Sequence, residues 1–262
     1  GLGAGDEVIV PSFTLAPCAD MVTLTGASPV LVDADPVTFN LTPALAEGAI
    51  TPATRAVLAV HLYGHPCDLS GLRALCDDHG IALVEDCAQA LGAQHRGRPV
   101  GSFGAIASYS FYANKVITTG EGGMVTTDDA ALAARLRSLR SHAQVADEAR
   151  PYLHTEVGFN YRLSAFGAAV GLAQLARLDE FLDRKARNAA RYRDALSGCR
   201  GVTVAAPTTG ADRHAHWAYA ILVEPAVIAG GAGGLATHLL AHGYETRRFY
   251  PPLHLHPGAE DR

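Results

Sequence analysis

Short, continuous apolar runs alternate with segments of helical character in the first third of this sequence. Four runs end at a proline or at polar residues: Glu7–Val10, Pro29–Asp35, Ala56–Tyr63 and Ile81–Glu85. Helices are expected between them, at Leu15–Gly26, Pro43–Ile50 and Leu69–His79, the last with Gly80 as its C-cap. Continuous apolar runs are typical of strands buried on both faces, and the helices supply the crossovers that parallel strands need. The sequence therefore predicts an α/β fold with a mostly parallel sheet.

Three polar residues lie at or just after the predicted strand ends. They are His61, Asp86 and Lys115. Because parallel α/β sheets bind ligands at the carboxyl ends of their strands, we expect a site at this edge.

Lys115 stands at the centre of the segment Gly101–Thr127. An apolar run, Ile106–Tyr112, precedes it, and a glycine-rich turn and a second apolar run, Met124–Thr127, follow. A lysine in a buried setting loses its proton readily and can then attack a carbonyl carbon. The alternative is a hairpin whose lysine extends from the tip into solvent, and this segment alone leaves both readings open.

The pattern changes in the second half of the chain. A helix is expected at Asp128–His142, capped by Asp128 or Asp129, and a long bridging helix at Ala165–Ser197. Beyond it we predict three strands, at Val202–Ala205, Trp217–Val223 and Tyr244–Arg248. They surround a helix at Leu235–His242, and a flexible glycine turn is expected at Gly230–Gly234. We therefore predict a large α/β domain over residues 1–197 and a smaller α+β domain over residues 198–262.

Composition narrows the classes of function. The 262 residues are 48% apolar and 18% charged, which fits a globular protein with a sizeable core. A net charge of −5 without basic runs disfavours a nucleic-acid or membrane surface, and no apolar stretch approaches the roughly 20 residues of a membrane span. Five cysteines without a CxxC pair indicate reduced thiols in the cytoplasm, and the His/Cys clusters lack zinc-site spacing, so no metal is expected.

Three residues together match the needs of pyridoxal phosphate chemistry. A lysine holds the aldehyde as a Schiff base, a carboxylate keeps the pyridine nitrogen protonated, and hydroxyl and backbone N–H groups bind phosphate. Lys115, Asp86 and Ser110 supply these groups. Singly, Asp86 could be a helix N-cap and Ser110 an ordinary strand hydroxyl, so it is the combination that is informative.

Several long motifs extend this match. They are GDEVIVPSFT, PVLVDAD, AVHLYGHPCDL, VEDCAQALGA, SFYANKVITTGEGGMV and GFNYRLS. Over nearly its whole length the chain resembles the DegT/DnrJ/EryC1/StrS family of sugar aminotransferases. The resemblance implies the type I fold of pyridoxal phosphate enzymes, with a mostly parallel mixed sheet flanked by helices and a small C-terminal α+β domain.

The resemblance also implies roles for individual residues. Lys115 would hold the cofactor and, once released, move a proton as a general acid and base. Asp86 would pair with the pyridinium, Gln89 would bind the ring hydroxyl, and Ser110 would bind phosphate. Asn160 would reach the phosphate of a neighbouring subunit, which implies a homodimer with a shared site, although it could also be a turn residue that caps the next helix. Leu15 occupies a position where the family usually has an aromatic residue stacked on the cofactor.

Three motifs, at residues 110–115, 154–162 and 244–254, point to the substrate. SFYANK, HTEVGFNYR and YETRRFYPPLH resemble enzymes of the perosamine-synthase type, which implies a nucleotide-linked 4-keto-6-deoxy sugar and glutamate as amino donor. Arg247, Arg248 or His254 would bind the sugar nucleotide or the donor carboxylate, since guanidinium forks fit both anions. The two arginines could equally be an ordinary surface pair.

Other readings remain. The alternatives are a glutamine-dependent aminotransferase acting on cyclitols or other keto-sugars, a sugar dehydratase that uses the same cofactor, and a silent binding or regulatory relative. Dehydratases that resemble this family have histidine at the position of Lys115, and a silent relative is expected to lack Lys115 or Asp86. Aminotransfer is therefore favoured. In the family a Ser-Gly-Thr segment precedes GDEVIVPSFT and helices follow PLHLHP, so we expect a chain truncated at both ends.

Overall fold

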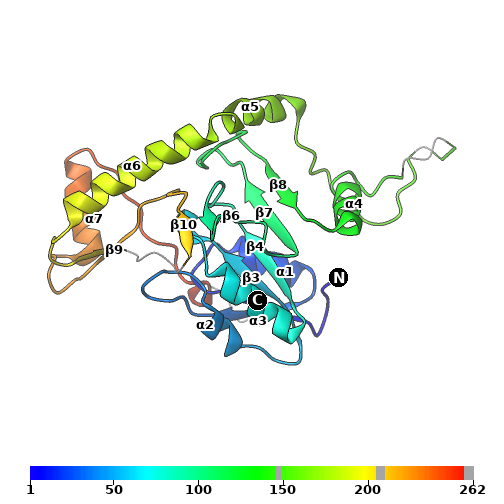
Figure 1. The fold of residues 1–262 in the computed structure, drawn as a ribbon, viewed down its shortest axis with the longest axis horizontal. Helices are drawn as coiled ribbons and strands as arrows, with labels where there is room; N and C mark the ends of the chain where they lie inside the picture. Colours follow the sequence, from blue (N-terminus) through cyan, green and yellow to red (C-terminus); the bar gives the residue numbers. More distant parts are fainter. Residues whose placement is uncertain (146–148, 151, 205–209, 257–262) are drawn as a thin grey trace.

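A six-stranded sheet forms the centre of the protein (Figure 1). The computed structural model describes residues 1–145, 149–150, 152–204 and 210–256. In spatial order the strands are β2 (Ser28–Val32), β1 (Glu7–Pro11), β3 (Thr54–Val60), β4 (Ala82–Asp86), β7 (Ile106–Ser110) and β8 (Gly123–Thr126). All neighbours pair in parallel except β7 and β8, which are antiparallel. The mostly parallel mixed sheet predicted from the sequence is confirmed.

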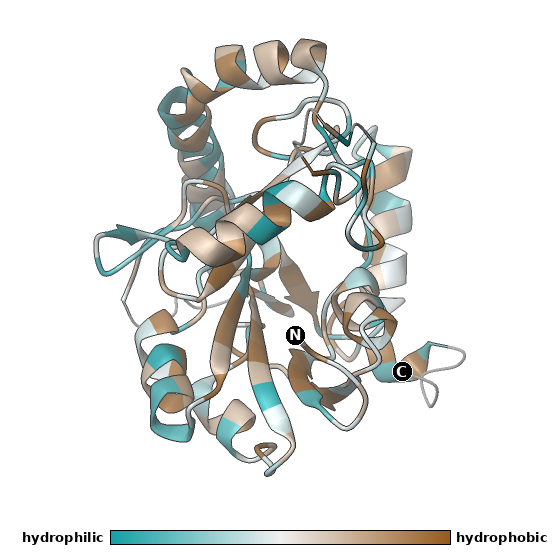
Figure 2. Ribbon diagram, turned by 90° about the vertical axis from the view of Figure 1, so that its right-hand side faces the viewer, coloured by the Kyte–Doolittle hydropathy of each residue, from teal (hydrophilic) through white to brown (hydrophobic). Residues whose placement is uncertain are grey.

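Both faces of the sheet are buried around β1 and β3, as the continuous apolar runs predicted, whereas Met124 and Val125 of the edge strand β8 are exposed. Val8 and Val10 of β1 belong to a cluster with Ala19 and Val22 of helix α1 (Pro17–Leu24). Ile9, which lies between them, belongs to a second cluster that includes residues of α3 (Leu69–His79). Alternate side chains of a strand point to opposite faces, so a single strand contributes to both clusters. The central strands accordingly carry hydrophobic colours in Figure 2.

Local signals place the N-terminal helices. The side chain of Thr42 accepts a hydrogen bond at the start of α2 (Pro43–Glu47), and that of Asp68 does so at the start of α3. Helix α3 ends at Gly80 in the left-handed conformation with φ 63°, as predicted. Asp129 caps α4 (Ala130–Leu139) by accepting from two backbone N–H groups. Polar residues at these positions satisfy backbone donors that have no partner within the helix.

The prediction of a single helix over Ala165–Ser197 was wrong. Two helices, α5 (Ala165–Leu175) and α6 (Leu178–Leu196), follow one another along the upper edge of the molecule in Figure 1. The backbone leaves helical geometry at Arg177, whose φ and ψ are −112° and 12°. Two acidic residues then open α6, and the Arg177 side chain binds one of them, Glu180, at 2.9 and 3.0 Å. Acidic side chains stabilise a helix N-terminus, which favours a new start at this point.

The C-terminal part differs from the predicted pattern in several respects. Strand β9 (Val202–Val204) pairs with β11 (Ile221–Val223), so only the end of the predicted strand Trp217–Val223 is a strand. The predicted strand Tyr244–Arg248 is wrong, since these residues adopt no regular structure. Most of the predicted glycine turn instead forms the first turn of α7 (Gly231–Ala241). Residue 205 lies outside the described residues.

An additional small sheet joins the two halves of the chain. Strand β10 (Ala211–Arg213) pairs with β5 (Gln94–His95), which pairs with β6 (Arg98–Pro99). This places the segment after β10 beside the large sheet. The division at residues 197 and 198 stays a prediction. None of the helices in the described residues has the length and apolar character needed to cross a membrane.

Candidate active site

Three predicted residues lie at one edge of the central sheet. Asp86 is the last residue of β4, and in the parallel pairing of β4 with β7 it stands opposite Ser108, two residues before Ser110. Lys115 lies in the turn between β7 and β8, where its backbone N–H donates to the Tyr112 carbonyl at 3.0 Å. Asp86 is close enough for its negative charge to act on the Lys115 amine. The edge therefore combines an amine, a carboxylate and a hydroxyl.

The Lys115 amine is half-buried and faces an aromatic ring. Its Nζ lies 4.6 Å from the centroid of the Trp217 ring, and no hydrogen-bond acceptor is recorded for it among the described residues. Burial lowers the pKa of the Lys115 amine below its usual value, while the charge of Asp86 opposes this shift. A lowered pKa increases the fraction of neutral amine at physiological pH, and the neutral amine is the nucleophile.

Asp86 is held by a cysteine that the sequence reasoning missed. Its Oδ2 accepts from Cys18 Sγ at 3.3 Å, and its Oδ1 accepts from the Ala88 backbone N–H at 2.8 Å. Burial, and then the charge of Asp86, raise the pKa of the Cys18 thiol, so the thiol stays protonated and acts as donor. A carboxylate oxygen can accept two hydrogen bonds, and each oxygen of Asp86 has one recorded donor, so Asp86 can accept another. No sequence motif identifies Cys18, since it lies 68 residues from Asp86.

Gln89 is anchored in an aromatic group that lies beside Lys115. It is buried, and its Oε1 accepts the Tyr63 backbone N–H at 2.6 Å. The Tyr63 ring stacks with Trp217 at 6.4 Å and with Tyr250 at 5.9 Å, and the Gln89 side chain also bonds with the Tyr250 hydroxyl. The aromatic residues come from three distant parts of the chain, so only the folded structure brings them together.

Ser110 and Leu15 lie at strand ends of this edge. The Ser110 Oγ accepts the Tyr112 backbone N–H at 3.3 Å, which leaves its own hydroxyl proton available to a ligand. Leu15 follows β1 and is 39% exposed. An exposed aliphatic side chain at this position can pack against a bound apolar face.

Four predicted site residues have no recorded contact with Lys115 or Asp86. Asn160 forms an isolated bridge with Ser141 beyond α4, and its side chain is exposed. Arg247 is exposed and lies 3.8 Å from Glu245. Arg248 is exposed, with its guanidinium beside Gly233 of α7. His254 Nδ1 bonds to the Ser12 Oγ at 2.7 Å, which ties the C-terminal segment to the end of β1.

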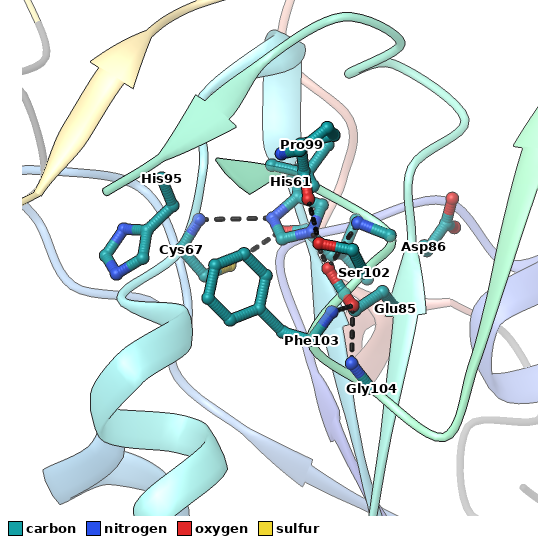
Figure 3. Close-up of polar contacts among 12 residues, drawn as sticks. His61, Cys67, Glu85, Asp86, His95, Pro99, Ser102, Phe103 and Gly104 are labelled. Carbon is teal, nitrogen blue, oxygen red and sulfur yellow. Dashed lines mark hydrogen bonds and ion pairs between the residues drawn. The ribbon is translucent and has the colours of Figure 1, made fainter. Parts of the chain in front are cut away.

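The His61 side chain does not face this edge, contrary to the expectation, although its backbone N–H donates to the Asp86 carbonyl at 3.2 Å. It is fully buried with Glu85, whose Oε2 lies 3.3 Å from His61 Nε2 (Figure 3). His61 Nδ1 accepts the Cys67 backbone N–H at 3.1 Å. The imidazole is therefore satisfied at both nitrogens and points into the core, so it does not reach Lys115.

Glu85 collects donors from a single loop. Its carboxylate accepts backbone N–H groups from Gly101 at 2.6 Å, Phe103 at 2.8 Å and Gly104 at 2.6 Å. Burial alone would raise the pKa of Glu85, but the His61 and backbone hydrogen bonds lower it below its usual value. His61, Glu85 and Cys87 offer ligand atoms within 4.8 Å of one another. Because these hydrogen bonds already occupy the histidine and the carboxylate, the cluster is explained without a metal.

Comparisons with known proteins show the family and the fold of the chain. The model of the DegT/DnrJ/EryC1/StrS aminotransferase family matches residues 1–262. The chain is 44% identical to a GDP-perosamine synthase of Caulobacter vibrioides, covering 98% of this chain and 68% of the relative. It is 43% identical to dTDP-3-amino-3,4,6-trideoxy-alpha-D-glucose transaminase of Streptomyces venezuelae, covering 98% and 65%.

A solved structure has the same fold. The S. venezuelae protein DesV, determined in complex with a ketimine intermediate, superposes with a TM-score of 0.91 at 41% identity, covering 99% of this chain and 68% of DesV. The predicted fold class is confirmed. The chain spans about two thirds of the length of these relatives.

Proposed function

The chain belongs to the DegT/DnrJ/EryC1/StrS aminotransferase family, and we propose that it uses Lys115 and pyridoxal phosphate to aminate a nucleotide-linked 4-keto-6-deoxy sugar with glutamate as donor. The observation that carries the proposal is the half-buried Lys115 amine, for which the described part of the chain records no hydrogen-bond acceptor and on which the charge of Asp86 acts. The names of the perosamine synthase and the dTDP-sugar transaminase support a sugar nucleotide as substrate.

The residues of the edge fit pyridoxal phosphate. When bound, this cofactor supplies an electron sink that stabilises negative charge at the carbon from which a proton is removed. Lys115 would hold its aldehyde carbon covalently, and the remaining acceptor capacity of Asp86 would receive the pyridinium N–H. Gln89 would bind the ring hydroxyl, Ser110 would donate to the phosphate, and Leu15 would pack against the ring.

Lys115 would also move the proton of the reaction. Its lowered pKa allows the released Nζ to accept a proton from the Cα of the amino donor at neutral pH. The charge of Asp86, which raises the pKa of the Lys115 amine, would stabilise the ammonium that forms. The same two residues thus serve first in binding and then in proton transfer.

A homodimer with a shared site is part of the proposal. Helix α5 and the segment before it expose large apolar side chains, among them Val157 (84% exposed) and Phe166 (81%). Figure 2 shows mostly hydrophobic colours on α5, at the top of the view. A surface of this kind on a folded protein marks a protein interface. A second copy is the partner that fits, because Asn160 lies on this surface and has no recorded contact with the Lys115 of its own chain.

The apolar face is directly connected to the Lys115 turn. Gln174 of α5 accepts the Thr118 N–H through Oε1 at 3.1 Å and donates through Nε2 to the Thr118 carbonyl at 2.7 Å. A subunit docked on α5 would therefore stand next to the turn that carries the lysine, which is where Asn160 of a partner is proposed to act.

The phosphate and carboxylate groups of the substrates are proposed to bind to the C-terminal segment. Arg247 and Arg248 are exposed, and guanidinium groups bind phosphate and carboxylate in two-point geometry. His254 is held beside β1 by Ser12 and is proposed to face the sugar. We also propose a cytoplasmic location, because all five cysteines are free thiols and disulfides persist mainly in oxidising compartments.

Absorbance spectroscopy tests the proposal. Pyridoxal phosphate is added to the purified chain and to Lys115→Ala, followed by glutamate and then a GDP-linked 4-keto-6-deoxy sugar. We expect an absorption band near 400 nm (about where this cofactor absorbs when linked to a lysine) in the parent chain only, its loss with glutamate, and an amino sugar as product. A band that persists in Lys115→Ala would contradict the assignment of the lysine. An amino product formed from glutamine but not from glutamate would contradict the assignment of glutamate as the amino donor.

A further inference from the structure

We propose that Trp217 is a positioning residue for Lys115, whose free ammonium it holds over its indole ring while its N–H fixes the adjoining backbone. The inference rests on the role proposed for Lys115. Trp217 was expected only as part of a strand, and no role in the site follows from the sequence.

Two contacts join Trp217 to the lysine turn. The indole Nε1–H donates to the Asn114 carbonyl at 2.8 Å, one residue before Lys115. The Lys115 Nζ lies 4.6 Å from the centroid of the same ring. One side chain, from a segment about one hundred residues further along the chain, thus contacts both the backbone and the amine of this turn.

The indole itself is held from several directions. Its ring stacks on Tyr63 with an interplanar angle of 6°, and its backbone N–H donates to the Tyr63 carbonyl at 3.0 Å. The Trp217 carbonyl lies 3.5 Å from the Nζ of Lys185 in α6. Because Tyr63 is in turn bonded to Gln89, the ring belongs to the same rigid group as the predicted ligand of the cofactor hydroxyl.

The chemistry of an ammonium over an indole face explains what this arrangement does. The negative face of the ring attracts the protonated amine and has little attraction for the neutral one. A lysine side chain is long and flexible, and the described residues provide no recorded hydrogen-bond acceptor for this amine. Trp217 therefore keeps the amine at the sheet edge whenever the lysine is free and protonated. It touches the lysine rather than the substrate, so its removal should affect turnover more than substrate binding.

Fluorescence of the unloaded chain tests the contact itself. Trp217 is the only tryptophan in the sequence, so emission excited above the tyrosine absorption comes from this ring alone. A nearby ammonium quenches indole emission, and we expect the emission of the parent chain to rise as pH increases from 7 to 10 and Lys115 loses its proton. Burial raises the pKa of the stacked Tyr63, so that phenol stays neutral over this range.

Two lysine variants decide the origin of the change. Lys115→Met should lose the rise in emission between pH 7 and 10. Lys185→Met, which removes the amine beside the Trp217 carbonyl, should keep that rise. A rise in emission that survives in Lys115→Met, or that is absent from the parent chain, overturns the proposal. Neither measurement needs bound cofactor, so this result is separate from the absorbance test of the proposed function.

Kinetics of the cofactor-loaded enzyme test the consequence. Trp217→Leu removes the ring and should lower kcat by roughly 2- to 30-fold, the range set by a cation–π contact, with KM changed by less than about 2-fold. Trp217→Phe keeps a ring but loses the N–H, so its kcat should lie between those of the parent enzyme and Trp217→Leu. An unchanged kcat in Trp217→Leu, or a loss confined to KM, overturns the proposal; if that variant fails to fold, Trp217→Phe and the Lys115→Met titration still decide.

Discussion

Glu85 and Asp86 are consecutive residues of β4 whose carboxylates serve opposite faces of the central sheet. Asp86 faces Cys18 and acts on Lys115, whereas Glu85 is fully buried between His61 and the loop of residues 101–104. Adjacent residues of a strand point in opposite directions, so two acids in sequence acquire unrelated environments. The Asp86 carboxylate is available to a ligand, whereas the Glu85 carboxylate holds the loop of residues 101–104 in place.

Replacement of Glu85 should destabilise the fold. Glu85→Gln keeps the size but removes the charge, and its amide N–H₂ would face backbone donors in the buried loop. Loss of a buried carboxylate that accepts several hydrogen bonds is expected to lower the free energy of unfolding by about 2–4 kcal/mol. Urea denaturation of the two proteins measures this difference. Asp77→Asn, which breaks an exposed pair with Arg73, is the control and should leave the midpoint nearly unchanged. Equal midpoints for Glu85→Gln and the parent chain would contradict the structural role.

The same carboxylate predicts a pH dependence of stability. The folded pKa of Glu85 is lowered from its usual value of 4.5, so the folded state binds its proton less tightly than the unfolded chain does. The stabilisation is complete above the unfolded pKa and is lost as pH falls below about 4.5 toward the folded pKa. The stability difference between the parent chain and Glu85→Gln should therefore shrink between pH 6 and pH 3 in urea titrations. A difference that stays constant over this range would refute the assignment.

The five thiols should react at very different rates. Cys199 is exposed, whereas burial raises the pKa of Cys18, Cys67, Cys76 and Cys87. Only the thiolate reacts with iodoacetamide, so we expect one fast-labelled cysteine at pH 8 in the native protein. Mass spectrometry identifies it, and Cys199→Ser should abolish the fast phase. Rapid labelling of Cys18 would contradict its role as a protonated donor to Asp86.

A charge on the apolar face of α5 should separate the subunits. Phe166→Asp places a carboxylate on the proposed interface, where burial in a dimer would strip it of water. We expect the parent protein to sediment as a dimer and this variant as a monomer with an unchanged circular dichroism spectrum. Leu24→Asp, at a similarly exposed position on α1, is the matched control and should remain dimeric. A monomeric parent protein, or a dimeric Phe166→Asp variant, would count against the proposed interface.

Features that depend on near neighbours in the sequence were predicted well. The apolar runs identified the main strands, and Gly80 and Asp129 marked helix ends because their effects are local. The break at Arg177 was missed because alanine, arginine and leucine all favour helix, and leucines recur at helical spacing on both sides of it.

The site residues divide along the same line. Asp86 and Lys115 could be placed at one edge because each follows a predicted strand, although the same argument misplaced His61, and Ser110 was added by the chemistry that the cofactor needs. Cys18 and Trp217 could not, because their contacts with Asp86 and Lys115 depend on how α1 and the segment after β10 pack against the sheet. The pairing of β10 with β5 joins segments more than one hundred residues apart, and no local pattern encodes it.

The paired hydrogen bonds between Gln174 and Thr118 have a thermodynamic consequence. They join the helix proposed to meet a second copy with the turn that carries Lys115. If docking of a subunit on α5 orders that turn, association and cofactor loading are linked equilibria. By reciprocity, the factor by which assembly tightens cofactor binding equals the factor by which the cofactor tightens assembly. Dilution of the protein would then act as a means of unloading its active site.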